Sequence, residues 1–168
     1  MLRPGDIVTQ KNTKINKINF KDNKPNRLSV VLFHYIDEDG RLYYCTAPIT
    51  NATKGIYNKI NSSNHYYMNH SILSNTKFCC VKLDSAYLYN ADSVHHTSLN
   101  VGETMLYGIY KKMLLIEPNE DEIEFYNFVK IMINDTIDRN RKALKKEYKE
   151  KQKEKKLRRK ELKNNYKK

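Results

Sequence analysis

The feature that most constrains the fold is a pair of apolar runs joined by a sharp turn, between residues 28 and 49. Residues 28–35 are continuous, β-branched and aromatic, which is typical of a core strand. The turn Asp37-Glu38-Asp39-Gly40 follows, and Asp-Gly supplies the positive φ angles of tight hairpins. Residues 41–49 return as the partner strand, which we expect to end or reach a sheet edge at Pro48, because proline cannot donate to the ladder. The sequence therefore predicts an antiparallel β-hairpin.

Further strands flank this hairpin. Residues 6–10 alternate around Ile7, residues 76–83 also alternate, and residues 85–89 are a third candidate. Between them, residues 11–26 form a long connection rich in Lys and Asn, and residues 50–75 are polar and irregular. We expect loops in both of these segments.

Two helices are predicted after the strands. Asn100 to Glu103 has the form of a capping box, and the apolar residues behind it repeat at helical spacing until Pro118 ends the helix near Glu117. Asn119 to Glu122 is a second capping box, followed by apolar residues up to about Ile137.

Strands followed by helices predict an α+β protein, a small antiparallel β-barrel with helical additions. We expect residues 1–117 to form the barrel domain with its terminal helix, and residues 118–168 to form a C-terminal helix that is basic from about residue 139.

The net charge is concentrated in one segment. It is +12 overall, and residues 139–168 hold 16 Lys/Arg against 4 Glu, whereas residues 1–138 hold 15 residues of each sign. Such a tail has three interpretations: nonspecific nucleic-acid binding that weakens in salt, docking of an acidic partner along a helix, or a solvated helix. Mixed-sign pairs such as Glu147 and Lys151 favour a helix.

The cysteines and the hydropathy pattern indicate a cytoplasmic protein. Cys45, Cys79 and Cys80 do not form a disulfide framework, so we expect reduced thiols. No signal segment opens the chain, and no apolar run approaches the roughly 18–20 residues that cross a bilayer, so no membrane partner is expected. Four histidines lie in polar stretches without the spacing of a zinc site: His65, His70, His95 and His96. We expect no metal and no other cofactor.

Three blocks in a fixed order carry a family resemblance. They are Arg3-Pro4-Gly5-Asp6-Ile7-Val8, Arg27 before the apolar run, and Ala47-Pro48-Ile49-Thr50. The chain resembles the MazF/PemK family of type II toxin–antitoxin endoribonucleases, whose members have Gly-Asp-Ile/Val, then Arg-Pro before a Val/Leu-rich strand, then Ala-Pro-Ile-Thr-Ser. The resemblance covers residues 1 to about 100. It implies an SH3-like, PemK-like barrel, a homodimer, single-stranded RNA as substrate and an antitoxin protein as partner.

The same resemblance implies a chemistry and two catalytic residues. In metal-independent cleavage the 2′-hydroxyl of RNA attacks the neighbouring phosphorus, so the enzyme must remove one proton, stabilise the added charge and protonate the leaving oxygen. A guanidinium matches two phosphate oxygens at once, and a hydroxyl can donate one more hydrogen bond. In the family, an arginine at the start of the second strand and a threonine closing the third do this work. Arg27 and Thr50 match them.

Departures from the family pattern motivate a second hypothesis. Leu28 replaces the proline after Arg27, Asn51 replaces the serine after Thr50, and lysines fill the first loop. These changes also suit a noncatalytic nucleic-acid- or protein-binding member that acts through its basic tail. Tyr66 and Tyr67 either stack on exposed bases or cover the barrel. The residues that we expect to contact RNA are Lys14, Lys17, Lys21, Lys24, Asn51, Tyr66, Tyr67, Arg139 and Arg141.

Overall fold

The structure is a computed structural model, and it describes residues 1–10, 28–51, 64–68 and 79–165. The chain divides into two compact units, Met1–Lys130 and Ile131–Lys168. This division falls within the last helix, whereas the break predicted at residue 117 lies at the turn between two helices.

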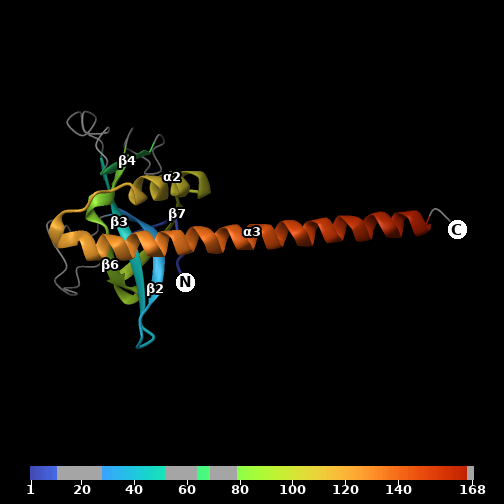
Figure 1. The fold of residues 1–168 in the computed structure, drawn as a ribbon, viewed down its shortest axis with the longest axis horizontal. Coiled ribbons are helices and arrows are strands. Elements are labelled where there is room, and N and C mark those ends of the chain that lie inside the picture. Colours follow the sequence, from blue (N-terminus) through green and yellow to red (C-terminus); the bar gives the residue numbers. More distant parts are fainter. Residues whose placement is uncertain (11–27, 52–63, 69–78, 166–168) are drawn as a thin grey trace. The chain divides into compact units, whose positions relative to one another are not determined.

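The described part of the first unit contains a seven-stranded antiparallel sheet (Figure 1). The strands are β1 (Asp6–Gln10), β2 (Leu28–Ile36), β3 (Leu42–Asn51), β4 (His65–Met68), β5 (Cys79–Lys82), β6 (Tyr87–Asn90) and β7 (Val94–Asn100). Their order is β4-β5-β3-β2-β1-β7, and β6 pairs with β3. The α+β class is therefore confirmed. Among the described strands no pairing joins β4 to β7, so the sheet is open where the sequence predicted a closed barrel.

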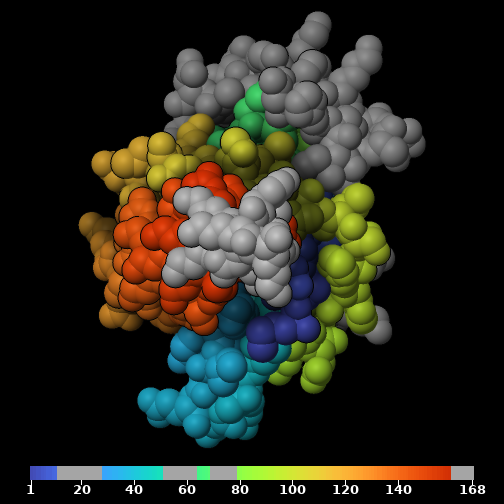
Figure 2. Space-filling view, turned by 90° about the vertical axis from the view of Figure 1, so that its right-hand side faces the viewer, coloured from blue at the N-terminus to red at the C-terminus, as the bar shows by residue number. Residues whose placement is uncertain are grey.

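The predicted hairpin is confirmed as β2 and β3. Its turn is closed by the Asp37 amide, which donates to the Arg41 carbonyl at 3.0 Å, and by the Gly40 amide, which donates to the Asp37 carbonyl at 3.0 Å. Gly40 has φ +79°, and open space surrounds the place of a Cβ, so its role is purely conformational. The hairpin projects from the first unit, at the bottom of Figure 2, where the tip residue Ile36 is 53% exposed.

Strand β3 does not end at Pro48 as predicted, because β3 changes partners there. One edge of β3 follows β2, with Pro48 opposite Ser29. The other edge pairs with β6 through residues 43–46 and with β5 through residues 49–51. Pro48 lies between these two stretches, so its missing N–H removes no ladder hydrogen bond to β5 or β6. The strand continues to Asn51.

Helices pack on one side of the sheet, which we call the helix face. They are α2 (Glu103–Leu114) and the first part of α3 (Ile123–Asn165). The Phe33 and Phe128 rings meet edge to face at 6.0 Å, and the Tyr110 hydroxyl donates to the Leu32 carbonyl. Burial raises the pKa of Tyr110, so this phenol stays protonated and remains a donor. These contacts fix α2 and the start of α3 on β2.

The other side of the sheet, the opposite face, has its own apolar cluster. Its buried members are Val8, Val31, Tyr44 and Val94, and its partly buried members are Leu2, Leu42, Tyr89 and Ala91. Because strand side chains alternate between faces, β2 and β3 supply apolar residues to both clusters.

Both predicted capping boxes are wrong. Asn100 is the last residue of β7, and α2 begins at Glu103 with Gly102 as its N-cap and no side-chain cap bond. Asn119 precedes a short 3₁₀ turn, again without a side-chain cap bond, and α3 begins at Ile123. The first box fails because the Asn100 side chain bonds the Gly102 amide and Asp6 instead.

The basic tail is helical. Helix α3 has 43 residues and continues to Asn165. Within the second unit, Lys151 Nζ lies 2.6 Å from Glu147 Oε1, and this contact raises the pKa of Lys151 and lowers that of Glu147. None of the described helices combines the length and apolar character needed to cross a bilayer.

Candidate functional site

The start of β2 and the end of β3 meet at one end of the sheet. Ser29 lies opposite Pro48 and Val30 opposite Ala47, so the antiparallel register carries Thr50 to the end where β2 begins at Leu28. Arg27 precedes Leu28 in the chain and lies outside the described residues. Thr50 is therefore at the predicted end of the sheet.

Thr50 belongs to a row of side chains on the opposite face. Its register partner on β5 is Cys80, whose partner on β4 is Tyr67. Directly opposed residues of an antiparallel ladder project from the same face, so Thr50, Cys80 and Tyr67 line up across three strands. Thr50 and Tyr67 are half-buried, whereas Cys80 is fully buried. A hydroxyl and a phenol thus border this end of the sheet.

The two neighbouring tyrosines point to different faces. Tyr66 is opposite Val81, which is opposite Ile49, so Tyr66 lies on the helix face. A Cβ placed on Gly108 of α2 would come within 2.4 Å of the Tyr66 hydroxyl oxygen, so Tyr66 packs directly against this helix. Tyr67 alone shares a face with Thr50.

Two further polar residues lie on the Thr50 face, one row along. Lys82 is two residues beyond Cys80 on β5, and it is directly opposite His65 of β4. Both are half-buried. Lys82 was not among the residues predicted from sequence, although its alternation with Cys80 was visible. The position of His65 opposite it depends on β4, which the sequence did not predict.

An amide–hydroxyl cluster connects the three strands next to this end. Gln10 Nε2 donates to Ser29 Oγ at 3.0 Å and to Thr46 Oγ1 at 2.7 Å. Ser29 and Thr46 are fully buried, so these bonds satisfy groups that would otherwise be costly to bury. Because Thr46 and Thr50 are separated by an even number of residues along β3, the cluster lies on the same face as Thr50 and supports it.

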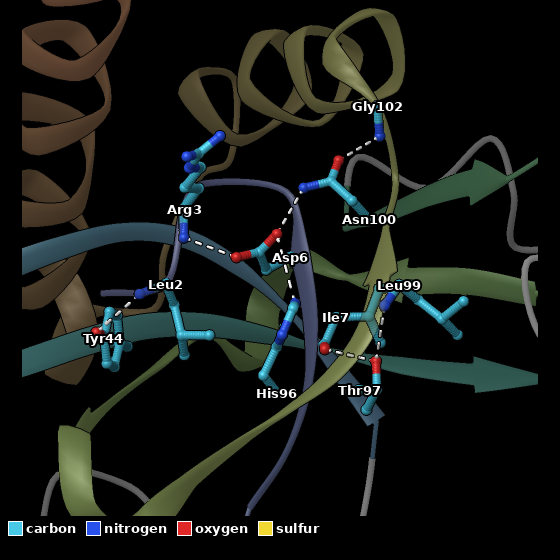
Figure 3. Close-up of polar contacts among 10 residues, drawn as sticks. All are labelled: Leu2, Arg3, Asp6, Ile7, Tyr44, His96, Thr97, Leu99, Asn100 and Gly102. Carbon is cyan, nitrogen blue, oxygen red and sulfur yellow. Dashed lines mark hydrogen bonds and ion pairs between the residues drawn. The ribbon is translucent and has the colours of Figure 1, made fainter.

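The first block of the motif forms a structural corner (Figure 3). Gly5 has φ +92°, its amide donates to the Val31 carbonyl at 2.8 Å, and its carbonyl accepts from the Val101 amide at 2.9 Å. Asp6, whose side chain is only 13% exposed, accepts from the Arg3 amide at 2.7 Å and from Asn100 Nδ2 at 2.8 Å. The block therefore ties β1 to the ends of its neighbours.

The charged groups of the corner do not form a second reactive site. His96 Nε2 lies 3.8 Å from Asp6 Oδ1. The Arg3 side chain points away from the Asp6 carboxylate in Figure 3, and only its backbone amide makes the bond. Asp6 is thus occupied by hydrogen bonds that hold the chain.

The thiols are protonated and buried. Burial raises the pKa of Cys45 and that of Cys79. A protonated, enclosed thiol is a weak nucleophile, so cysteine chemistry is not the role of these side chains. Within the described part of the chain, no group of three or more His, Cys, Asp or Glu side chains is placed to hold a metal ion.

The remaining predicted contact residues lie elsewhere. In the second unit Arg139 is exposed, and Arg141 Nη1 lies 3.8 Å from Asp138 Oδ1 with both side chains more than 60% exposed. Such a pair holds the guanidinium weakly. Asn51 pairs through its backbone with Cys79. Four lysines lie outside the described residues: Lys14, Lys17, Lys21 and Lys24.

Comparison with known proteins adds no relative: no protein-family model and no curated protein sequence matches the chain.

The corner predicts unequal costs for two glycine substitutions. Gly40→Ala should lower the free energy of unfolding by about 1 kcal/mol, the cost of a left-handed backbone with a Cβ. Gly5→Ala should cost more, because its Cβ would also lie 3.1 Å from Asn100 Oδ1, and that amide is fixed by Asp6 and Gly102. Denaturant unfolding of both variants measures the difference. An equal or smaller loss for Gly5→Ala would show that the corner is not tightly packed.

Proposed function

We propose that this protein is a MazF/PemK-like endoribonuclease toxin, which cleaves single-stranded RNA sequence-selectively and without a metal. The observation that supports the proposal is the register of β2 and β3. Thr50 of the third motif block lies at the end of the sheet where β2 starts, and Arg27 of the second block directly precedes that start in the sequence. Two residue types suited to a phosphate, 23 positions apart in the chain, thus come from elements that meet at one end of the sheet.

The proposed chemistry assigns one role to each residue. The Arg27 guanidinium binds the scissile phosphate and stabilises the negative charge that develops when the 2′-hydroxyl attacks. The Thr50 hydroxyl donates a further hydrogen bond to the same phosphate. The phosphorus–5′-oxygen bond then breaks, leaving a 2′,3′-cyclic phosphate and a 5′-hydroxyl. An arginine is almost always protonated, so it suits charge stabilisation better than proton removal.

The finer fold and the biological setting belong to the same proposal. We assign the sheet to an SH3-like, PemK-like scaffold, which the partner change of β3 supports. A strand that pairs with different neighbours along its length is one way in which small β folds turn a corner. The expected state is a cytoplasmic homodimer that an antitoxin protein inhibits.

Cleavage of RNA in EDTA tests the catalytic assignment. The protein should cut a long mixed-sequence single-stranded RNA at defined positions and leave cyclic-phosphate ends. Arg27→Ala and Thr50→Ala should each lower the cleavage rate by roughly 100- to 1,000-fold, because each removes a donor to the developing charge.

Two control variants make this comparison specific. Thr50→Ser retains the hydroxyl and should retain most of the activity. Arg41→Ala removes an arginine of the hairpin turn that is 63% exposed and lies 3.5 Å from Asp39, so it should cut RNA normally. Intact RNA with the wild-type protein, or equal rates in all variants, would refute the assignment.

The alternative function is a noncatalytic PemK-like protein that binds nucleic acid or protein through its basic C-terminal helix. Its support is that residues 139–168 account for the entire net charge. In addition, nearly every described side chain from 139 to 159 is exposed. An exposed cationic helix suits a phosphate backbone.

The salt dependence of RNA binding tests this alternative. Replacing Lys145, Lys149, Lys153 and Lys156 by glutamine should weaken binding. It should also reduce the slope of log K against log salt by about 0.7 for each phosphate that the helix no longer neutralises. An unchanged slope in fluorescence anisotropy would show that the helix does not bind RNA.

A further inference from the structure

We propose that Lys82, His65 and Tyr67 form the binding subsite for the nucleotide next to the cleaved bond, with Lys82 holding its phosphate. This inference rests on the proposed function, because it takes Thr50 as the position of the scissile phosphate. None of the three residues belongs to a motif block of the family resemblance.

The placement follows from the ladder of β3, β5 and β4. Thr50 is opposite Cys80, and Lys82 is two residues beyond Cys80 on the same strand. Residues in this diagonal relation on one face lie about 7–8 Å apart. The alternation holds to the end of β5, since Lys82 keeps an extended backbone at φ −83° and ψ 108°. Lys82 therefore projects on the same side as Thr50.

The reach and charge of Lys82 suit a neighbouring phosphate. Its ammonium sits on a flexible four-carbon stem, which can extend across the diagonal gap toward Thr50. Lys82 is half-buried, and within the described residues it makes no ion pair. Asp84, the acid nearest in sequence, accepts from Ser85 Oγ at 3.2 Å instead. An ammonium without a described carboxylate partner is a binding element for an anion.

His65 and Tyr67 supply flat rings beside this cation. His65 is directly opposite Lys82, and Tyr67 ends the Thr50 row on the same strand as His65. Splayed RNA bases stack on aromatic side chains, and an imidazole can also hydrogen-bond a base edge. Tyr66 lacks this possibility because it packs on Gly108. The RNA strand would thus cross from β3 over β5 to β4, with its phosphates on Thr50 and Lys82 and a base on the rings.

Binding of an uncleavable RNA tests the subsite independently of catalysis. The probe is a pool of mixed-sequence, fully 2′-O-methylated 20-nucleotide RNAs with a fluorescent end. The variants are made in the full-length protein. Lys82→Gln should weaken binding at least fivefold, and it should reduce the salt slope by about 0.7, the share of one phosphate contact. Tyr67→Leu should weaken binding about tenfold, whereas Tyr67→Phe keeps the ring and should bind normally.

Lys111→Gln is the matched control, because Lys111 is an exposed lysine of the first unit whose Nζ lies 4.9 Å from the centre of the Tyr107 ring. It should bind as the wild type does. Thermal unfolding checks that each variant is folded, and an unfolded Lys82→Gln is replaced by Lys82→Arg, which should retain binding, and Lys82→Met, which should lose it. Equal affinity and slope for the Lys82 and Lys111 variants would overturn the subsite, as would a wild-type protein that does not bind the pool.

The outcomes separate this inference from the proposed function. A protein that binds the pool through Lys82 but leaves natural RNA intact retains the subsite and loses the ribonuclease assignment. A protein that cuts RNA at the same rate with Lys82→Gln, and binds equally, retains the assignment and loses the subsite.

Discussion

The register between β2 and β3 is the constraint on which the rest of the structure depends. The turn from Asp37 to Arg41 closes only one alignment, and a shift by one residue would exchange the two faces of both strands. Such a shift would place Val31 on the helix face and expose Phe33 to the opposite cluster. The same alignment carries Thr50 to the start of β2. Packing and the proposed chemistry therefore depend on one hairpin.

The two faces of the sheet divide the work. The helix face is closed by α2 and the start of α3, through contacts such as Phe33 with Phe128. The opposite face is buried around Val8 and Val31 but becomes polar toward Thr50, where Gln10 bonds two buried hydroxyls. A rigid, hydrogen-bonded support beside a half-buried polar row is the arrangement by which a folded scaffold positions a site.

The local parts of this fold were predictable from sequence, and the parts that depend on distant pairing were not. The hairpin is visible because Asp39-Gly40 and the apolar runs act over a few residues. Strand β4 was missed because its four residues are polar and aromatic within a polar stretch. The Asn100 capping box failed because Asn100 is needed by Asp6, 94 residues earlier in the chain. The same limit applies to the candidate site, where sequence reasoning selected Thr50 by motif and Tyr66 with Tyr67 by composition. It could not tell the two tyrosines apart, because only the pairing of β4 with β5 places one on the helix and the other beside Thr50. Lys82 was overlooked for the same reason, since its value comes from the residue diagonal to it on another strand.

The most direct test of RNA binding at this end of the sheet is a map of amide chemical shifts in ¹⁵N-labelled full-length protein as it is titrated with the 2′-O-methylated RNA pool. We predict that the largest early changes occur at Thr50, Cys80 and Tyr67, with Asp6 and Asn100 little affected. Changes confined to the basic helix, with Thr50 and its row unmoved at saturation, would contradict the claim that RNA binds at this end of the sheet.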